Sequence, residues 1–145
     1  MATTGVDISE VTIRKCTQLA QEKEVHVNGI IADLNEDEIG TGKYDLITCF
    51  HFFDRLLLPK IIGLLKPQGM FILEPFSIDH PEHSTHGPRN PDYLIKPNEL
   101  LETLKLWKIL YYEDTIVVLN KGSQQEISAI VRLIVRNCPI EANII

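Results

Sequence analysis

Two aspartates, Asp7 in "GVDIS" and Asp33 in "IIADL", directly follow short apolar stretches of strand-like composition. In open α/β sheets, ligands bind outside the carboxyl ends of the strands. A carboxylate at such an end can accept hydrogen bonds from both hydroxyls of a ribose, so Asp7 is a candidate nucleotide-binding residue. The competing interpretation is an exposed acid beside a helix N-terminus, where the helix dipole favours negative charge. Residue type and spacing alone leave both interpretations open.

Further strand ends carry Phe50 with His51, and Glu74. A histidine at this edge could take a proton if one must leave a bound substrate. Arg89 in "GPRNPDY" is a permanent cation whose planar fork can hold an anionic substrate through two hydrogen bonds. A salt bridge that anchors the surrounding segment would explain Arg89 equally well.

Three histidines, His80, His83 and His86, stand three residues apart in "DHPEHSTH". With Asp79 or Glu82 they resemble a loose set of metal ligands. No cysteine lies nearby in the sequence, and the prolines make the segment irregular. We therefore expect a polar loop over an active site and no metal.

Helix-like and strand-like segments alternate along the chain. Residues 9–23 have a helical apolar face, and Ser9 can accept a hydrogen bond from a first-turn amide. Pro59 fits the first turn of a second short helix, and "KPQG" at residues 66–69 predicts a turn. The β-rich segments that predict strands are residues 25–33, 44–50, 70–74, 107–114 and 127–137. This order predicts an α/β fold with a largely parallel sheet that is covered on both faces.

Residues 75–97 are rich in proline, histidine and asparagine and show no periodicity. Loops longer than about 12 to 15 residues are uncommon in compact domains and are usually functional lids or disordered. We interpret this segment as a lid. Residues 97–106 follow it as a predicted helix with Pro97 in its first turn.

The composition is that of a soluble globular protein. At 145 residues the chain fits one domain, residues 1–145. A net charge of −6 without a basic stripe argues against nucleic-acid binding, because phosphate affinity comes from clustered Lys and Arg. No apolar run approaches the ~18 residues that would span a membrane. The three cysteines form no C-x-x-C pair and no even set, which favours the reducing cytoplasm.

Several segments carry a family resemblance when they are taken together and in order, from about Gly5 to Arg136. They are "GVDIS", "ADL", "YDLITCFHFFDRLLLPKIIGLLKPQGMFILEPF", "GPRNPDYLIKPNELL", "ILYYED" and "SAIVRLIVR". This set resembles the class I S-adenosylmethionine-dependent methyltransferases, in particular the small bacterial enzymes related to the tellurite-resistance type. The "LKPQG" turn after "YDLI", followed by "FILE" and "GPRNPDYL", makes the set specific.

The resemblance implies a Rossmann-like, mostly parallel sheet with helices on both faces and an antiparallel last strand. The methyl donor, S-adenosylmethionine, would lie across the carboxyl ends of the strands. By this match Asp7 would bind the donor's ribose and Ile8 would pack on its adenine. Asp33 and Leu34 would flank the adenine ring.

The same resemblance implies that Phe50 and His51 line the methionine side of the donor. His51 and Arg89 are then the candidate catalytic residues, and the acceptor is a small molecule. Where the family usually has Pro-Gly-Gly, this chain has Pro67-Gln68-Gly69, which changes a turn away from the expected ligand.

Family members begin with a strand and a glycine-rich loop that lets the backbone approach the donor. Nothing before residue 5 supplies either, so we expect an N-terminally truncated domain with impaired donor binding. In the family's strand order, the missing strand lies at the sheet centre, and its loss would expose two apolar strand edges. The neighbouring strands could close the gap, a separate N-terminal piece could fill it, or another copy could do so. We expect self-association as a homodimer.

Three functions follow from these features. The first is methyl transfer to a small molecule, with tellurite, thiol, amine and hydroxyl acceptors all open. The second is a non-catalytic methyltransferase-like protein that acts through self-association or through a partner that completes the sheet. The third is a nicotinamide-dependent enzyme, which the absence of G-x-G-x-x-G weakens.

Overall fold

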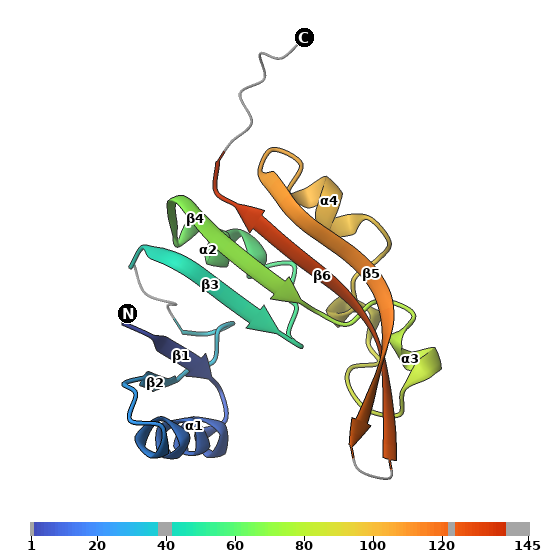
Figure 1. The fold of residues 1–145 in the computed structure, drawn as a ribbon. Helices are drawn as coiled ribbons and strands as arrows, with labels where there is room; N and C mark the ends of the chain where they lie inside the picture. The colour runs from blue at the N-terminus through green and yellow to red at the C-terminus, as the bar shows by residue number, and fades with distance from the viewer. Residues whose placement is uncertain (1, 38–41, 122–123, 139–145) are drawn as a thin grey trace. The chain divides into compact units, whose positions relative to one another are not determined.

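The chain forms two compact units in the computed structural model, Met1–Gly40 and Thr41–Ile145 (Figure 1). The structure describes residues 2–37, 42–121 and 124–138. No helix within these ranges is long and apolar enough to cross a membrane. The single domain that the sequence predicts stays a prediction.

The first unit is a strand, a helix and a second strand. β1 (Thr4–Asp7) pairs in parallel with β2 (Asn28–Ile31), and α1 (Glu10–Glu22) connects them. The predicted helix and its cap are confirmed, because the Ser9 hydroxyl accepts a hydrogen bond from the N–H of Thr12 at 3.3 Å. This cap satisfies one of the amides that the first turn of a helix leaves unpaired.

β2 begins later than predicted because residues after α1 are used to end the helix. Glu24 has a left-handed backbone (φ 54°). Its N–H donates to the carbonyl of Gln21 at 3.1 Å, and the N–H of Val25 donates to the carbonyl of Ala20 at 2.9 Å. Such bonds satisfy the last carbonyls of a helix. Within β2, a Cβ on Gly29 would lie 2.8 Å from the Ile13 side chain, so the helix packs directly on this backbone.

The second unit contains a four-stranded sheet in the order β3-β4-β6-β5. The strands are β3 (Tyr44–Phe50), β4 (Leu65–Glu74), β5 (Lys108–Lys121) and β6 (Gln124–Arg136). β3 pairs in parallel with β4, whereas β6 runs antiparallel to both β4 and β5. The predicted Rossmann-like α/β fold with an antiparallel last strand is confirmed.

Short helices complete the second unit: α2 (Leu58–Gly63), α3 (His80–His83), the 3₁₀ helix η1 (Pro91–Tyr93) and α4 (Glu99–Thr103). In Figure 1, α2 and α4 lie behind the sheet. Burial alternates along β4: Phe71 and Leu73 are buried, whereas Ile72 and Glu74 are half-buried. The helical segments and β6 contribute further buried residues, which are Leu57, Leu58, Ile61, Leu100, Leu104, Val131, Leu133 and Val135. The apolar face of the sheet therefore packs against these helices.

The turn predicted at residues 66–69 is instead an irregular part of β4, so that prediction is wrong. Gln68 has a left-handed backbone (φ 66°), and the register against β3 shifts between Tyr44 and Leu46. The cause is pairing with the chain after β6. The N–H of Gln68 donates to the carbonyl of Asn137 at 2.8 Å, and the N–H of Asn137 donates to the carbonyl of Gly69 at 2.8 Å.

Two further boundaries differ from the prediction. α4 is shorter than residues 97–106, because Asn98 has a left-handed backbone (φ 62°) that places Pro97 outside the helix. β5 continues beyond the predicted residues 107–114, because its pairing with β6 extends without interruption to Lys121 opposite Gln124.

Residues 75–97 contain α3 and η1, and two isolated bridges fix the segment. Phe76 pairs with Ile130 of β6, and Ser77 pairs with Ile95. His80, Leu94 and Ile95 are buried. The contacts anchor this segment at several points, and its interpretation as a lid stays a prediction.

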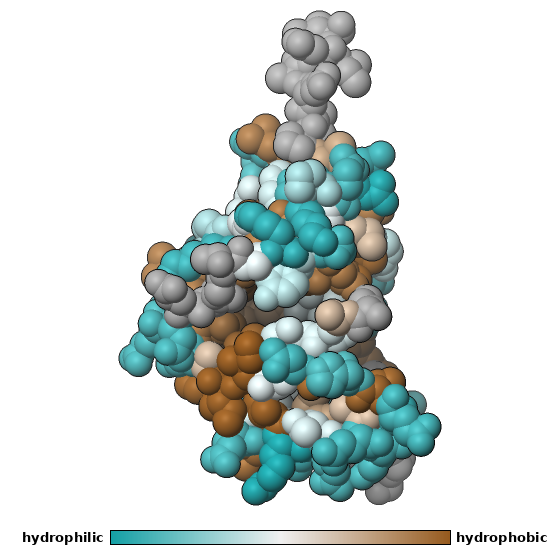
Figure 2. Space-filling model, turned by 90° about the vertical axis from the view of Figure 1, so that its left-hand side faces the viewer, coloured by the Kyte–Doolittle hydropathy of each residue, from teal (hydrophilic) through white to brown (hydrophobic). Residues whose placement is uncertain are grey.

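Apolar side chains also reach the surface, as the brown clusters in Figure 2 show. In the Met1–Gly40 unit, Ala20 is the one apolar residue that is buried among the described residues. Large hydrophobic residues of this unit are exposed, namely Val6, Ile8, Val11, Leu19, Val25, Ile30 and Ile31. By themselves, the described residues of this unit do not enclose an apolar core.

Candidate functional site

Asp7 ends β1, and Ile8 follows it just before α1. Oδ1 of Asp7 accepts a hydrogen bond from the N–H of Ser9 at 2.7 Å, which holds the carboxylate at the helix N-terminus. Oδ2 accepts no hydrogen bond from the residues that the structure describes, and Oδ1 retains a lone pair. The carboxylate can therefore still accept two hydroxyls. Ile8 is 67% exposed and offers an apolar surface beside it.

Asp33 and Leu34 follow β2 and are half-buried. Oδ1 of Asp33 accepts a hydrogen bond from the N–H of Asn35 at 2.9 Å, which fixes the turn. The N–H of Ala32 donates to the carbonyl of Asp7 at 3.1 Å, so the chain that leaves β2 runs beside the end of β1. The structure thus places both predicted adenosine-side segments at one edge of the two-stranded sheet, while their binding roles stay predictions.

Phe50 ends β3 opposite Glu74, the last residue of β4, and His51 follows it. His51 has a left-handed backbone (φ 57°), and its N–H donates to the Glu74 carbonyl at 2.8 Å. Nε2 of the imidazole lies 3.4 Å from Oε1 of Glu74. The ring also stacks on Phe76, with 4.9 Å between ring centroids. Both predicted residues are therefore beside Glu74, and their roles stay predictions.

A row of charged and polar side chains continues from Glu74 across β6 to β5. Nε of Arg132 donates to Oε2 of Glu74 at 2.7 Å, and Nη1 donates to Oε2 of Glu113 at 3.0 Å. The hydroxyl of Tyr111 donates to the same Glu113 oxygen at 2.9 Å. The hydrogen bonds from Tyr111 and Arg132 lower the pKa of Glu113. This row thus keeps Glu113 ionised and gives Glu74 a fixed cationic partner.

Arg89 is exposed, and its Nη2 donates to the carbonyl of Ser84 at 3.3 Å. The described contact is thus a hydrogen bond within the same segment and leaves most of the guanidinium donors available. The candidate role of Arg89 in holding an acceptor stays a prediction. No described contact joins Arg89 to the group around His51.

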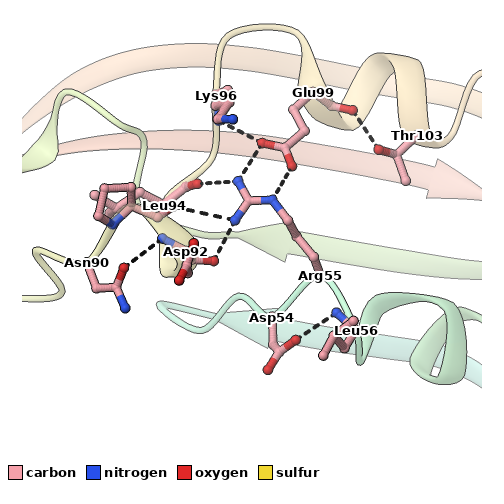
Figure 3. Close-up of polar contacts among 10 residues, drawn as sticks. Asp54, Arg55, Leu56, Asn90, Asp92, Leu94, Lys96, Glu99 and Thr103 are labelled. Carbon is pink, nitrogen blue, oxygen red and sulfur yellow. Dashed lines mark hydrogen bonds and ion pairs between the residues drawn. The ribbon is translucent and has the colours of Figure 1, made fainter.

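The guanidinium of Arg55 anchors the segment instead, as Figure 3 shows. Its Nη2 donates to the carbonyl of Leu94 at 2.8 Å, and its Nη1 donates to that of Asp92 at 2.5 Å. Both oxygens of Glu99 accept further hydrogen bonds from it. Hydrogen bonding to Glu99 is the main reason that the pKa of Arg55 is raised.

His80 is buried and uses both of its ring nitrogens. Nδ1 accepts a hydrogen bond from the N–H of Ala129 at 3.3 Å, so Nε2 carries the proton that points to the carbonyl of His86 at 2.8 Å. Its ring lies 4.1 Å from that of Phe76. Within the described ranges, no three His, Cys, Asp or Glu side chains gather as a metal site.

Sequence reasoning missed Arg55, Phe76 and Arg132 as residues that support the site. Arg132 lies opposite Glu113 in the pairing of β5 with β6. Aligning the two strands in the sequence would therefore have predicted this cross-strand charge pair. Arg55 has no comparable signal, because its partners lie 36 to 44 residues away in the sequence.

Comparisons with known proteins bear on the N-terminal part of the sequence and on the fold. Residues 1–69 match a family model described as a methyltransferase domain. The solved structure of TehB from Haemophilus influenzae superposes on this chain with a TM-score of 0.70 at 21% identity. The match covers 93% of this chain and 49% of TehB. A SAM-dependent methyltransferase from Methanosarcina mazei gives a TM-score of 0.64 at 14% identity, over 96% of this chain and 83% of that one.

The chain has the methyltransferase fold. A putative methyltransferase from Bacillus halodurans supports this, with a TM-score of 0.69 at 10% identity over 95% of this chain and 84% of the other. The resemblance inferred from the sequence is confirmed for the fold, and residues 1–69 carry the methyltransferase match. No curated protein matches the sequence significantly. The chain spans about half the length of TehB.

The methyltransferase match contains most of the candidate site. Asp7, Asp33 and His51 all fall within residues 1–69, whereas Glu74 and Arg89 follow it. The free oxygen of Asp7 and the exposed side chain of Ile8 fit the hydroxyls and the apolar ring of an adenosine. The residues present are therefore compatible with S-adenosylmethionine, whose sulfonium would supply an electrophilic methyl group.

Proposed function

We propose that this chain takes part in the transfer of a methyl group from S-adenosylmethionine to a small-molecule acceptor. The observation that carries the proposal is the placement of candidate residues at strand ends within the methyltransferase match: Asp7 after β1, Asp33 after β2 and His51 after β3. Asp7, Ile8, Asp33 and Leu34 hold the adenosine, and Phe50 and His51 serve the methionine side. The methyltransferase fold and the match of residues 1–69 to a methyltransferase domain support S-adenosylmethionine as the donor.

The chemistry requires little from the protein beyond positioning. Methyl transfer proceeds when the acceptor's nucleophile is held in line with the methyl group, so a strong protein base is often unnecessary. His51 takes a proton where one must leave the acceptor. Arg89 holds an anionic acceptor through its exposed guanidinium.

Titration with S-adenosylhomocysteine tests donor binding. Saturable heat with micromolar affinity in calorimetry would support the proposal, and saturation at a weaker affinity would agree with the impaired donor binding that the sequence predicts. Ligand at about 100 times its dissociation constant adds roughly 2.7 kcal/mol to the free energy of unfolding. This raises the melting temperature by roughly 5 to 10 °C for a chain of this size. Absence of both saturation and a thermal shift at millimolar ligand would contradict the proposal.

A second candidate function is association in the cytoplasm without catalysis. The observation that favours it is the exposed apolar surface of the Met1–Gly40 unit. Among the described residues of this unit, Ala20 alone is buried. β1 and β3 each pair with one neighbouring strand in the described ladders. In this proposal, a second copy of the chain pairs with these strand edges and covers the apolar side chains. The three free cysteines suit a reducing compartment.

Sedimentation velocity over a range of concentrations tests association. We expect a species of twice the 16.5 kDa chain mass. Val6→Lys places a charge on β1 and should shift the protein toward monomer. Ile116→Lys is the matched control, because Ile116 is 51% exposed on β5. A single monomeric species at every concentration would exclude the dimer.

A further inference from the structure

His51 is held in place by Glu74 and Phe76. Glu74 contacts His51 twice, through its carbonyl at 2.8 Å from the backbone nitrogen and through Oε1 at 3.4 Å from Nε2. Phe76 supports the ring face, with 22° between the two ring planes. The left-handed backbone of His51 is uncommon for a residue other than glycine, and such strain concentrates at functional sites.

Glu74 is itself fixed on its other side. Its Oε2 accepts the Nε–H of Arg132 at 2.7 Å, which leaves Oε1 for His51. Arg132 is oriented in turn by Glu113 at 3.0 Å. The Glu74 side chain is 20% exposed and that of His51 is 57% exposed, so a shielded carboxylate stands behind an accessible imidazole.

A carboxylate can only accept, so the imidazole nitrogen that faces Glu74 must carry the hydrogen. In the neutral ring, Nδ1 then has the free lone pair. We propose that Glu74 is the positioning residue that fixes the tautomer and orientation of His51, and that Nδ1 of His51 is the proton acceptor in methyl transfer. This inference rests on the proposed function.

The transfer moves one methyl group and one proton. The acceptor's heteroatom forms a bond to the methyl carbon as the bond between that carbon and the donor's sulfur breaks. The bonding pair remains on sulfur, which leaves the donor as a neutral thioether. The proton on the acceptor's heteroatom passes to Nδ1 of His51 and is later released to solvent.

Nitrogen NMR of the histidine rings tests the positioning role without donor or acceptor. In protein with ¹⁵N-labelled histidine at pH 9, where a histidine ring is neutral, ring ¹⁵N shifts report the tautomer. His51→Gln assigns the signal among the five histidines. We expect a single Nε2–H tautomer for His51 and ring protons shifted upfield by the stacked Phe76.

Glu74→Gln should produce a mixture of tautomers and reduce the upfield shift, because a carboxamide can either donate or accept. Glu74→Asp keeps the charge but draws the carboxylate away from the ring, and it should act in the same direction if Glu74→Gln does not fold. Glu102→Gln is the control, because the Glu102 side chain is 76% exposed and pairs with Lys105. A purely structural Glu74 would leave the His51 tautomer unchanged.

The result separates the two proposals. Unchanged tautomer and ring shifts in both folded Glu74 variants would overturn the positioning role, whatever the outcome of donor binding. Failure to bind S-adenosylhomocysteine, with the expected His51 signals present, would instead overturn the proposed function.

Discussion

Arg55 binds both carboxylate oxygens of Glu99, with Nε 2.6 Å from Oε1 and Nη2 2.8 Å from Oε2. The same guanidinium holds the carbonyls of Asp92 and Leu94. One side chain therefore joins the segment after β3 to η1 and α4. This clamp connects the stretch that carries His51 to the end of the segment that carries Arg89.

Replacing Arg55 by lysine should destabilise the protein. Lysine keeps the charge but lacks the planar fork that binds the two oxygens of Glu99 and the carbonyls together. Hydrogen bonds to charged groups contribute about 1.5–3 kcal/mol, so we expect a loss of about that size in urea unfolding. Lys105→Arg is the control, since Lys105 makes an exposed contact to Glu102. Equal stabilities of the two variants would contradict the clamp.

The same pair predicts a dependence of stability on pH. Burial by itself would raise the pKa of Glu99, but the hydrogen bonds from Arg55 and the N–H of Lys96 outweigh it and lower that pKa. The ionised form thus stabilises the fold above the ordinary pKa of about 4.3, and this contribution is lost as pH falls through the lower folded value.

Unfolding free energies measured from pH 7 down to about pH 3 should therefore fall less steeply in Glu99→Gln than in the wild-type protein. Glu102→Gln, whose side chain is 76% exposed, should retain the wild-type slope. If the unfolding free energies of the wild type and of Glu99→Gln fall in parallel with pH, the ionisation of Glu99 does not contribute to stability.

Two glycines should respond to alanine in opposite directions. Gly87 has φ +80°, and a Cβ there would lie 2.7 Å from Nε2 of the buried His80. Gly87→Ala should lower the free energy of unfolding by about 1–3 kcal/mol. At Gly63 in α2 a Cβ meets nothing within 4 Å. Gly63→Ala should raise stability by about 0.5–1 kcal/mol, because glycine is unfavourable in helices. Chemical denaturation measures both, and a neutral Gly87→Ala would refute the close packing.

The carboxylate of Asp7 should determine donor affinity. Asp7→Asn keeps an oxygen that can accept from Ser9 but removes the charge, and we expect affinity for S-adenosylhomocysteine to fall roughly 10- to 100-fold in calorimetry. Asp45→Asn is the matched control, because the Asp45 side chain is 85% exposed and pairs with Lys66. Equal affinities for Asp7→Asn and the wild type would remove Asp7 from the binding site.

Local signals predicted much of the fold. The bounds of β3 agree with the apolar stretch 44–50, and the Ser9 cap was readable because it depends on residues within one turn. The shortened α4 was not readable, because Asn98 adopts a conformation that its neighbours in sequence do not require. For the candidate site, the strand-end acids followed from their position, whereas the partners of His51 depend on pairing between strands distant in sequence.

The two hydrogen-bonded ladders have different consequences for screening. Amides of Val131 and Leu133, at the centre of the four-stranded ladder and fully buried, should exchange with solvent only when the whole sheet unfolds. The ladder of β1 and β2 has two strands, and such pairs open by local fluctuation. The midpoint of a melting curve therefore reports mainly on the larger ladder. Substitutions near Asp7 that abolish ligand binding should leave the midpoint of the ligand-free protein unchanged, so a variant library sorted by heat resistance without ligand would retain them.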